Sequence, residues 1–137
     1  MFKSFYKGKK VLVTGHTGFK GSWLTCWLIL LGAKVYGYSD SSRTSPSHFN
    51  LLKIENEIIH KIGDIRDLEK LKQFINEVQP DVVFHLAAQA IVSSSYTNPL
   101  LTISTNIFGT ANLMESVRCL TKKVVVVLIT SDKCYEN

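Results

Sequence analysis

Apolar and polar positions alternate along the chain in blocks that predict strands and helices in turn. Short runs rich in apolar and β-branched residues predict five strands, at positions 10–14, 33–38, 58–62, 81–86 and 124–130. Longer segments between them predict helices, at positions 22–31, 67–78 and 100–120. The strands are apolar on both faces, which is typical of parallel strands covered by helices. The pattern therefore predicts an α/β fold built on a doubly wound parallel sheet.

The connecting segments are polar and predict loops. Residues 39–56 are expected to form a loop with one helical turn near residues 48–53, and residues 87–99 form a second loop of small and polar residues. Asp67 is the expected N-cap of its helix. Composition agrees with one globular domain, because 45% of the 137 residues are hydrophobic and 20% are charged. Neither a repeat nor a linker divides the chain.

Composition and charge exclude several classes of function. The longest apolar run, residues 124–129, is far shorter than the ~20 residues that span a bilayer, so we expect no membrane association. The net charge of +5 is dispersed without a basic helical stripe, which argues against nucleic acid and favours the handling of a phosphorylated ligand. The three cysteines have no zinc or disulfide spacing and predict a cytoplasmic location.

The first predicted strand leads directly into a glycine-rich turn and then a helix. Gly15 allows the tight turn, Gly18 lets backbone approach a pyrophosphate, and Gly21 lets the helix pack against the strand. The free N–H groups of the helix start favour phosphate. A glycine-rich turn without a ligand is the alternative, and a Walker-type loop is disfavoured because no Gly-Lys-Ser/Thr ending follows. The candidate cofactor-binding residues of this turn are Gly15, Thr17, Gly18, Phe19, Lys20 and Gly21.

This turn and three later motifs resemble the extended branch of the short-chain dehydrogenase/reductase superfamily. The motifs are an Asp-hydrophobic pair after the third strand, His-Leu-Ala-Ala after the fourth, and Asn-x-x-Gly-Thr in the last helix. The resemblance implies an NAD-binding Rossmann domain over residues 1–137, with the first five strands present and the C-terminal, substrate-binding part of the family fold absent. The further cofactor-binding residues that it implies are Asp64, Ile65, Leu86, Ala87, Ala88, Gln89 and Asn106.

The end of the second strand bears on the choice of cofactor. NAD-binding folds usually place an acidic residue there to bind the adenosine ribose. Here Ser39 stands at that place, Asp40 follows, and Arg43 is a candidate partner of a 2′-phosphate. We expect NAD rather than NADP, because the sugar-nucleotide enzymes that the chain resembles recycle NAD.

The segment after the fifth strand resembles that of nucleotide-sugar 4,6-dehydratases, and specifically their CDP-glucose branch. The resemblance implies that NAD oxidises C4 of CDP-glucose, that water leaves across C5 and C6, and that the hydride returns to C6. Ser131 is expected to polarise the C4 oxygen and Asp132 to protonate the leaving hydroxyl. Lys133 replaces the usual Glu base, and its role stays open. The reaction would supply deoxysugars for surface polysaccharide.

Two departures from the family pattern limit this expectation. The Tyr-x-x-x-Lys pair of the family is not among these 137 residues, so we expect them to be inactive alone. Ser93 stands where close relatives are expected to carry Arg. An NAD-dependent epimerase or reductase, and a non-catalytic dinucleotide-binding module, remain as alternatives. The helix at 100–120 resembles a dimer element, which implies a homo-oligomer of the full-length protein.

Overall fold

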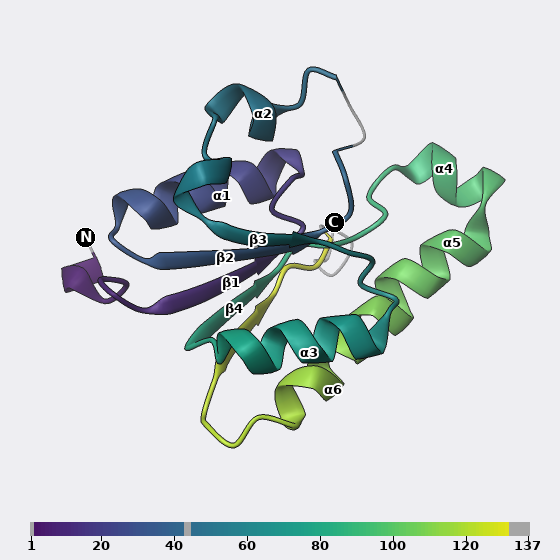
Figure 1. Cartoon of the computed structure of the whole chain (residues 1–137). Helices are drawn as coiled ribbons and strands as arrows, with labels where there is room; N and C mark the ends of the chain where they lie inside the picture. The colour runs from purple at the N-terminus through teal and green to yellow at the C-terminus, as the bar shows by residue number, and fades with distance from the viewer. Residues whose placement is uncertain (1, 43–44, 132–137) are drawn as a thin grey trace.

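A computed structural model describes residues 2–42 and 45–131 as three layers. A parallel sheet lies in the middle, with α1 (Phe19–Leu30) and α2 (His48–Leu52) on one face. The other face is covered by α3 (Leu68–Val78) and α6 (Gly109–Arg118), as Figure 1 shows. The layers are those expected of a doubly wound sheet, with helices on both faces.

The sheet has the predicted strands, and all of them are parallel. They are β1 (Lys10–Thr14), β2 (Lys34–Ser39), β3 (Ile59–Ile62), β4 (Val82–His85) and β5 (Val125–Leu128). Their order is β3-β2-β1-β4-β5. The chain thus builds outward from β1 to β3 and then crosses to the opposite side of β1 to form β4. The carboxyl ends of β1 and β4 lie at this topological switch point, where open α/β sheets bind their ligands.

The two faces of the central strand bury different layers of the core. Leu12 of β1 packs with Leu71 of α3 and Leu113 of α6. Its neighbours Val11 and Val13 pack on the other side, with residues of α1 and α2. All three β1 side chains are fully buried. This arrangement explains why the strands are apolar at consecutive positions rather than at alternate ones.

Three helices agree with the predicted segments apart from their ends. α1 begins three positions before the predicted start, and α2 occupies most of the predicted turn. α3 is capped as expected, because the Asp67 side chain accepts a hydrogen bond of 3.2 Å from Lys70 N. Short 3₁₀ turns at Phe2–Ser4 and Glu55–Glu57 were not predicted. None of the helices in residues 2–42 and 45–131 is long and apolar enough to cross a membrane.

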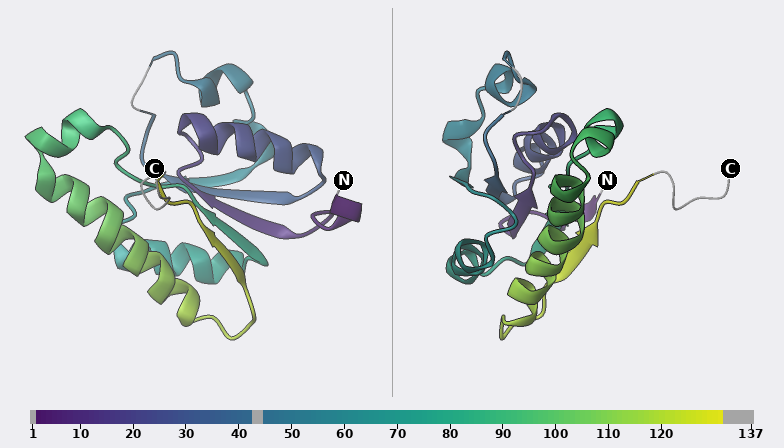
Figure 2. Two further views of the ribbon diagram at one scale, coloured as in Figure 1. Left: turned by 180° about the vertical axis from the view of Figure 1, so that it is seen from behind. Right: turned by 90° about the vertical axis from the view of Figure 1, so that its right-hand side faces the viewer.

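The segment from residue 87 to 120 differs from the prediction. The expected loop contains α4 (Val92–Thr97), and the expected single helix consists of α5 (Pro99–Ile103), a π-helical segment η3 (Ser104–Phe108) and α6. The Asn98 side chain caps α5 by accepting from Leu101 N at 3.2 Å. The small polar residues of α4 satisfy local carbonyl groups, so their polarity does not prevent a helix. Figure 2 shows α4 and α5 leading away from the sheet.

Candidate functional site

A cavity of about 580 Å³ lies at the carboxyl ends of β1, β2, β3 and β4. Its wall is formed by the segments that directly follow these parallel strands, so the sheet topology itself gathers them. Most of the predicted cofactor-binding residues line it: Gly15, Thr17, Gly18, Phe19, Asp40, Asp64, Ile65, Leu86, Ala87, Ala88 and Gln89. The structure thus brings together residues that are more than 70 positions apart in the chain.

The glycine-rich turn is packed tightly against neighbouring backbone at its first and third glycines. Gly15 has a φ of +76°, and a Cβ there would lie 2.7 Å from Ala87 N. A Cβ at Gly21 would overlap the carbonyl oxygen of Gly15. Gly18 is exposed at the cavity wall, with its own N–H donating to Gly15 O at 3.1 Å. The N-terminus of α1 therefore begins at the cavity, with no capping side chain and no acidic residue in its first turn.

A chain of hydroxyl groups ties this turn to the end of β2. Thr17 Oγ1 donates to the carbonyl oxygen of Asp40 at 3.1 Å. Its only hydrogen is then used, so Ser39 Oγ donates to Thr17 Oγ1 across 2.7 Å. Ser39 is buried, whereas Asp40 is exposed on the cavity wall. Asp40, which directly follows β2, is thus the exposed acidic side chain on this part of the cavity wall.

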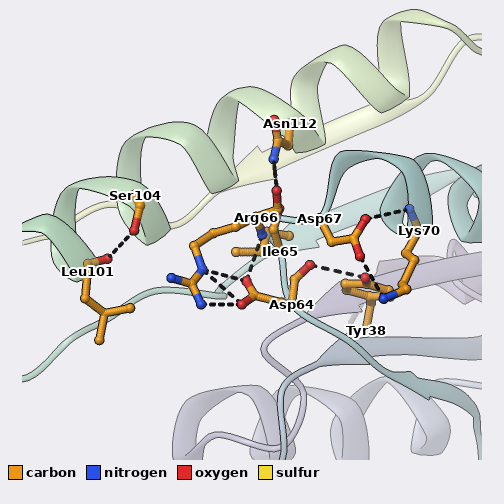
Figure 3. A network of polar contacts seen from close by, with 9 residues as sticks. All are labelled: Tyr38, Asp64, Ile65, Arg66, Asp67, Lys70, Leu101, Ser104 and Asn112. Carbon is orange, nitrogen blue, oxygen red and sulfur yellow. Dashed lines mark hydrogen bonds and ion pairs between the residues drawn. The ribbon is translucent and has the colours of Figure 1, made fainter.

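The backbone that follows β3 is held from both sides, as Figure 3 shows. Tyr38 Oη donates to the carbonyl oxygen of Asp64 at 3.2 Å. From α6, Asn112 Nδ2 donates to the carbonyl oxygens of Ile65 and Arg66 at 3.2 and 2.9 Å. Burial, with smaller contributions from Asp67 and Asp64, raises the pKa of Tyr38 to about 12, so its hydroxyl remains a donor. The backbone of this part of the cavity wall is therefore held in place by the side chains of Tyr38 and Asn112.

Arg66 is a cavity-lining residue that sequence reasoning missed. Its backbone N and its Nε each donate to Asp64 Oδ1 at 2.9 Å, and its guanidinium also contacts Oδ2 (Figure 3). The hydrogen bond to Asp64 raises the pKa of Arg66. The only sequence signal is a basic residue two positions after the acidic one. The pair places an oriented carboxylate and a fixed cation at one end of the cavity.

Asn106 lies on the π-helical segment η3. It does not line the cavity, and its side chain instead holds the loop that follows β4. Its Oδ1 accepts from Gln89 N at 2.8 Å, and its Nδ2 donates to Gln89 O at 3.1 Å. The Gln89 side chain in turn donates to Ile91 O at 3.0 Å and to Thr102 Oγ1 at 3.1 Å. The loop that carries Ala87 and Ala88 is thus fastened to α5 and η3 by part-buried hydrogen bonds.

The remaining predicted site residues lie elsewhere. Lys20 is exposed and does not line the cavity, and Gly21 is buried within the turn. Ser131 follows β5 and is exposed. Ser93 is exposed on α4. Three predicted residues fall outside the described part of the chain: Arg43, Asp132 and Lys133.

Two buried histidines flank the cavity, and sequence reasoning assigned neither of them to the site. His16 packs over Gly37, and its Nε2 lies 3.2 Å from Nδ1 of His60. His85 ends β4 and is bonded to two threonine hydroxyls. Burial lowers the pKa of each to about 4, and the nearby His60 contributes at His16. Both imidazoles are therefore neutral in the folded protein near pH 7.

These histidines predict acid lability. Between about pH 4 and pH 6.5 the unfolded chain binds more protons than the folded chain, because its histidines have the higher pKa. The contribution of the two neutral histidines to the free energy of unfolding is therefore complete above pH 6.5 and is lost as the pH falls through about 4. The difference is worth roughly 3 kcal/mol for each histidine. Thermal melting followed by circular dichroism from pH 7.5 to pH 4 should show a steep fall in Tm, with a shallower fall for His85→Gln. A Tm that is constant over this interval would contradict the expectation.

Comparisons with known proteins identify a family model and relatives that are similar in sequence and in structure. The family model described as GDP-mannose 4,6 dehydratase matches residues 12–136. CDP-glucose 4,6-dehydratase of Salmonella typhimurium is 51% identical over 135 residues, which cover 98% of this chain and 38% of that protein. The epimerase Mth375 of Methanothermobacter thermautotrophicus has a similar structure, with a TM-score of 0.81 and 36% identity over 94% of this chain and 37% of that one.

A second solved structure is that of UDP-glucose 4-epimerase from Thermus thermophilus, determined as a complex with NAD. Its TM-score is 0.71, with 31% identity over 80% of this chain and 33% of that one. The chain thus spans about a third of the length of the relatives that it matches. Since the family model covers nearly all of its residues, the chain belongs to the GDP-mannose 4,6 dehydratase family, among the nucleotide-sugar dehydratases and epimerases of the short-chain dehydrogenase/reductase superfamily.

Proposed function

We propose that the chain is the NAD-binding part of a nucleotide-sugar 4,6-dehydratase that acts on CDP-glucose. The observation that carries the proposal is the cavity at the switch point of the sheet, which joins the glycine-rich turn, Asp64 and the loop after β4. The 51% identity with a CDP-glucose 4,6-dehydratase supports the choice of reaction and of nucleotide sugar. We further propose that these 137 residues bind NAD but do not turn over CDP-glucose by themselves.

The residues of the cavity fit a dinucleotide along its length. The pyrophosphate would lie against Gly18 and the uncapped N-terminus of α1, where the absence of a Cβ leaves room and the helix offers N–H groups. Asp64 and Ile65 would hold the adenine, and Asp40 the adenosine ribose. Ala87 and Ala88 are small enough to leave space for the nicotinamide ribose beside the loop after β4.

Asp40 supports NAD over NADP. A 2′-phosphate on the adenosine ribose would bring negative charge to the Asp40 carboxylate, whereas the 2′-hydroxyl of NAD can donate a hydrogen bond to it. We expect NAD to bind at least about tenfold more tightly than NADP, which corresponds to ~1.4 kcal/mol. Asp40→Asn should narrow this preference by weakening NAD binding and strengthening NADP binding.

Isothermal titration calorimetry with both dinucleotides tests this preference. Glu77→Gln is the matched control, because it removes a carboxylate from the outer face of α3, far from the cavity wall. The control should leave both dissociation constants unchanged. A wild-type chain that prefers NADP, or an Asp40→Asn variant with an unchanged ratio, would contradict the assignment.

The chemistry that we assign to this chain follows from three residues after β5. When bound, NAD supplies the hydride acceptor for C4 of the hexose and the hydride donor for C6. Ser131 donates a hydrogen bond to the C4 oxygen, and Asp132 donates a proton to the hydroxyl that leaves C6. In the sequence, Lys133 replaces the Glu that the resemblance implies as the base at C5, and an amine acts as a base only where its charged form is disfavoured.

Product analysis of an enzyme that contains this chain tests the proposed reaction. Proton NMR after incubation with CDP-glucose should show a new methyl group at C6 and a keto group at C4. GDP-mannose and UDP-glucose serve as alternative substrates and should be consumed more slowly. A product that is inverted at one carbon and keeps its C6 hydroxymethyl group would instead establish the epimerase alternative.

A further inference from the structure

His85 occupies the centre of a buried polar chain that lies behind the cavity wall. Only 4% of its surface is exposed, and it does not line the cavity itself. Its Nδ1 lies 2.6 Å from Thr14 Oγ1, at the end of β1. Its Nε2 lies 3.0 Å from Thr110 Oγ1, in the first turn of α6. The imidazole of His85 in β4 therefore links β1, through Thr14, to α6, through Thr110.

The hydroxyl groups determine which nitrogen carries the proton. Thr110 Oγ1 donates its only hydrogen to the carbonyl oxygen of Asn106 at 2.7 Å. Thr110 must therefore accept from His85, which requires a hydrogen on Nε2. In the neutral imidazole Nδ1 is then an acceptor, so Thr14 donates to it. The donors in this chain of hydrogen bonds all point in the same direction, and successive hydrogen bonds arranged in this way strengthen one another.

Both ends of this chain of hydrogen bonds reach the same loop, which follows β4. Thr14 Oγ1 lies 3.4 Å from Ala87 N, the donor at the first end. At the other end, the side chain of Asn106 holds both the N–H and the carbonyl oxygen of Gln89. Ala87 and Gln89 line the cavity, on either side of Ala88. The loop is therefore fastened at two points two residues apart, and His85 connects the two fastenings.

The π-helical segment helps to bring these groups together. Asn106 belongs to η3, and Thr110 follows in the first turn of α6, so both side chains face β4 and its loop from one continuous helical stretch. Single π-helical turns within α-helices occur frequently at functional sites, where they re-aim a side chain. Here the π turn carries the side chain that grips Gln89.

We infer that His85 is a positioning residue, which holds residues 87–89 in the conformation that receives the nicotinamide half of NAD. The inference rests on the proposed function, since it is NAD binding that gives this loop its role. His85 acts through Thr14, Thr110 and Asn106 and touches no cofactor atom. Its replacement should weaken binding of the nicotinamide half selectively, and leave the adenosine and pyrophosphate contacts intact.

Substitutions at His85 and at a control position separate a positioning role from a contribution to stability alone. His85→Leu fills a similar space but leaves the hydroxyls of Thr14 and Thr110 without their partner. His85→Gln keeps one acceptor oxygen and one donor nitrogen, the same pair of roles that the neutral imidazole has. Thr25→Val is the matched control, because Thr25 is a fully buried threonine of α1 outside the polar chain.

The test compares the dissociation constants of NAD and of ADP, which lacks the nicotinamide and its ribose, by calorimetry at pH 7.5. We expect NAD to lose about tenfold in affinity in His85→Leu, while the affinity for ADP changes less than about threefold. His85→Gln should restore most of the NAD affinity. Thr25→Val should leave the ratio of the two constants at its wild-type value, even where its Tm is lower.

The possible outcomes separate the positioning role from the proposed function. An unchanged ratio in His85→Leu, or a Gln variant no better than the Leu variant, overturns the positioning role. If His85→Leu does not fold, Thr110→Val replaces it, because it removes the acceptor at the other end of the same chain, and it should shift the ratio in the same direction. A wild-type chain that binds neither NAD nor ADP would refute the proposed function instead.

Discussion

Replacing Gly18 with alanine is expected to lower the affinity for NAD by at least about 100-fold, or ~2.7 kcal/mol, while the chain remains folded. The backbone of Gly18 has φ −72° and ψ 166°, values that alanine adopts without strain. A Cβ there meets one atom within 4 Å among the described residues, the Gly15 carbonyl oxygen at 3.3 Å. The methyl group would therefore stand in the cavity, where the pyrophosphate has to approach the N-terminus of α1.

Calorimetry with NAD and a melting curve on the same sample measure the two effects separately. Gln73→Ala, on the outer face of α3, is the matched control and should alter neither the affinity nor the Tm appreciably. Full NAD affinity in Gly18→Ala would show that the dinucleotide does not pass over this turn. A loss of folding in Gly18→Ala would contradict the steric account of the turn.

Replacing Gly21 with alanine is expected to have the opposite character, a large loss of stability. The added Cβ would overlap the carbonyl oxygen of Gly15 and lie 2.9 Å from the Cα of His16. Both neighbours are backbone atoms, so no change of side-chain rotamer relieves the overlap, and the turn has to open. We expect a loss of about 3 kcal/mol or more in the free energy of unfolding. That corresponds to a fall in Tm of roughly 10 °C for a domain of this size.

Thermal melting in the absence of ligand measures this effect. Lys20→Ala changes the neighbouring, exposed position of the same helical turn and should shift the Tm by less than about 2 °C. A Gly21→Ala variant that melts within about 2 °C of the wild type would contradict the close packing between turn and helix. The two glycines thus report on different surfaces, Gly18 on the ligand side and Gly21 on the protein side.

The sheet and the glycine-rich turn were predicted from the sequence because both depend on local signals. The parallel sheet follows from the alternation of strands and helices, and Gly15 and Gly18 lie directly between a strand and a helix, with Gly21 in the first turn of that helix. Asp64 and Ile65 reach the cavity because β3 is parallel to β1, so the segments after both strands lie at one edge. Period and order along the chain were sufficient for the sheet and the turn, whereas Asp64 and Ile65 were predicted from the resemblance to the short-chain dehydrogenase/reductase superfamily.

The parts that were missed depend on contacts between distant segments or on local caps. α4 was predicted as part of a loop because residues 87–99 are small and polar, and the serines of α4 are poor helix formers. The π-helical turn has no signal in the apolar pattern. Arg66 and His85 could not be assigned their partners from sequence, because each role depends on which side chains the fold places beside it.

The central claim, that NAD binds along the carboxyl edge of the sheet, is tested most directly by backbone amide NMR during a titration with NAD. We expect chemical-shift changes at Gly18, Asp40, Ile65 and Ala88, which lie on four separate segments of the cavity wall. Amides in the shallow groove between α3 and α6, such as those of Asn76 and Leu120, should not move. Shifts confined to that groove, or no shifts from a folded chain at saturating NAD, would contradict the claim.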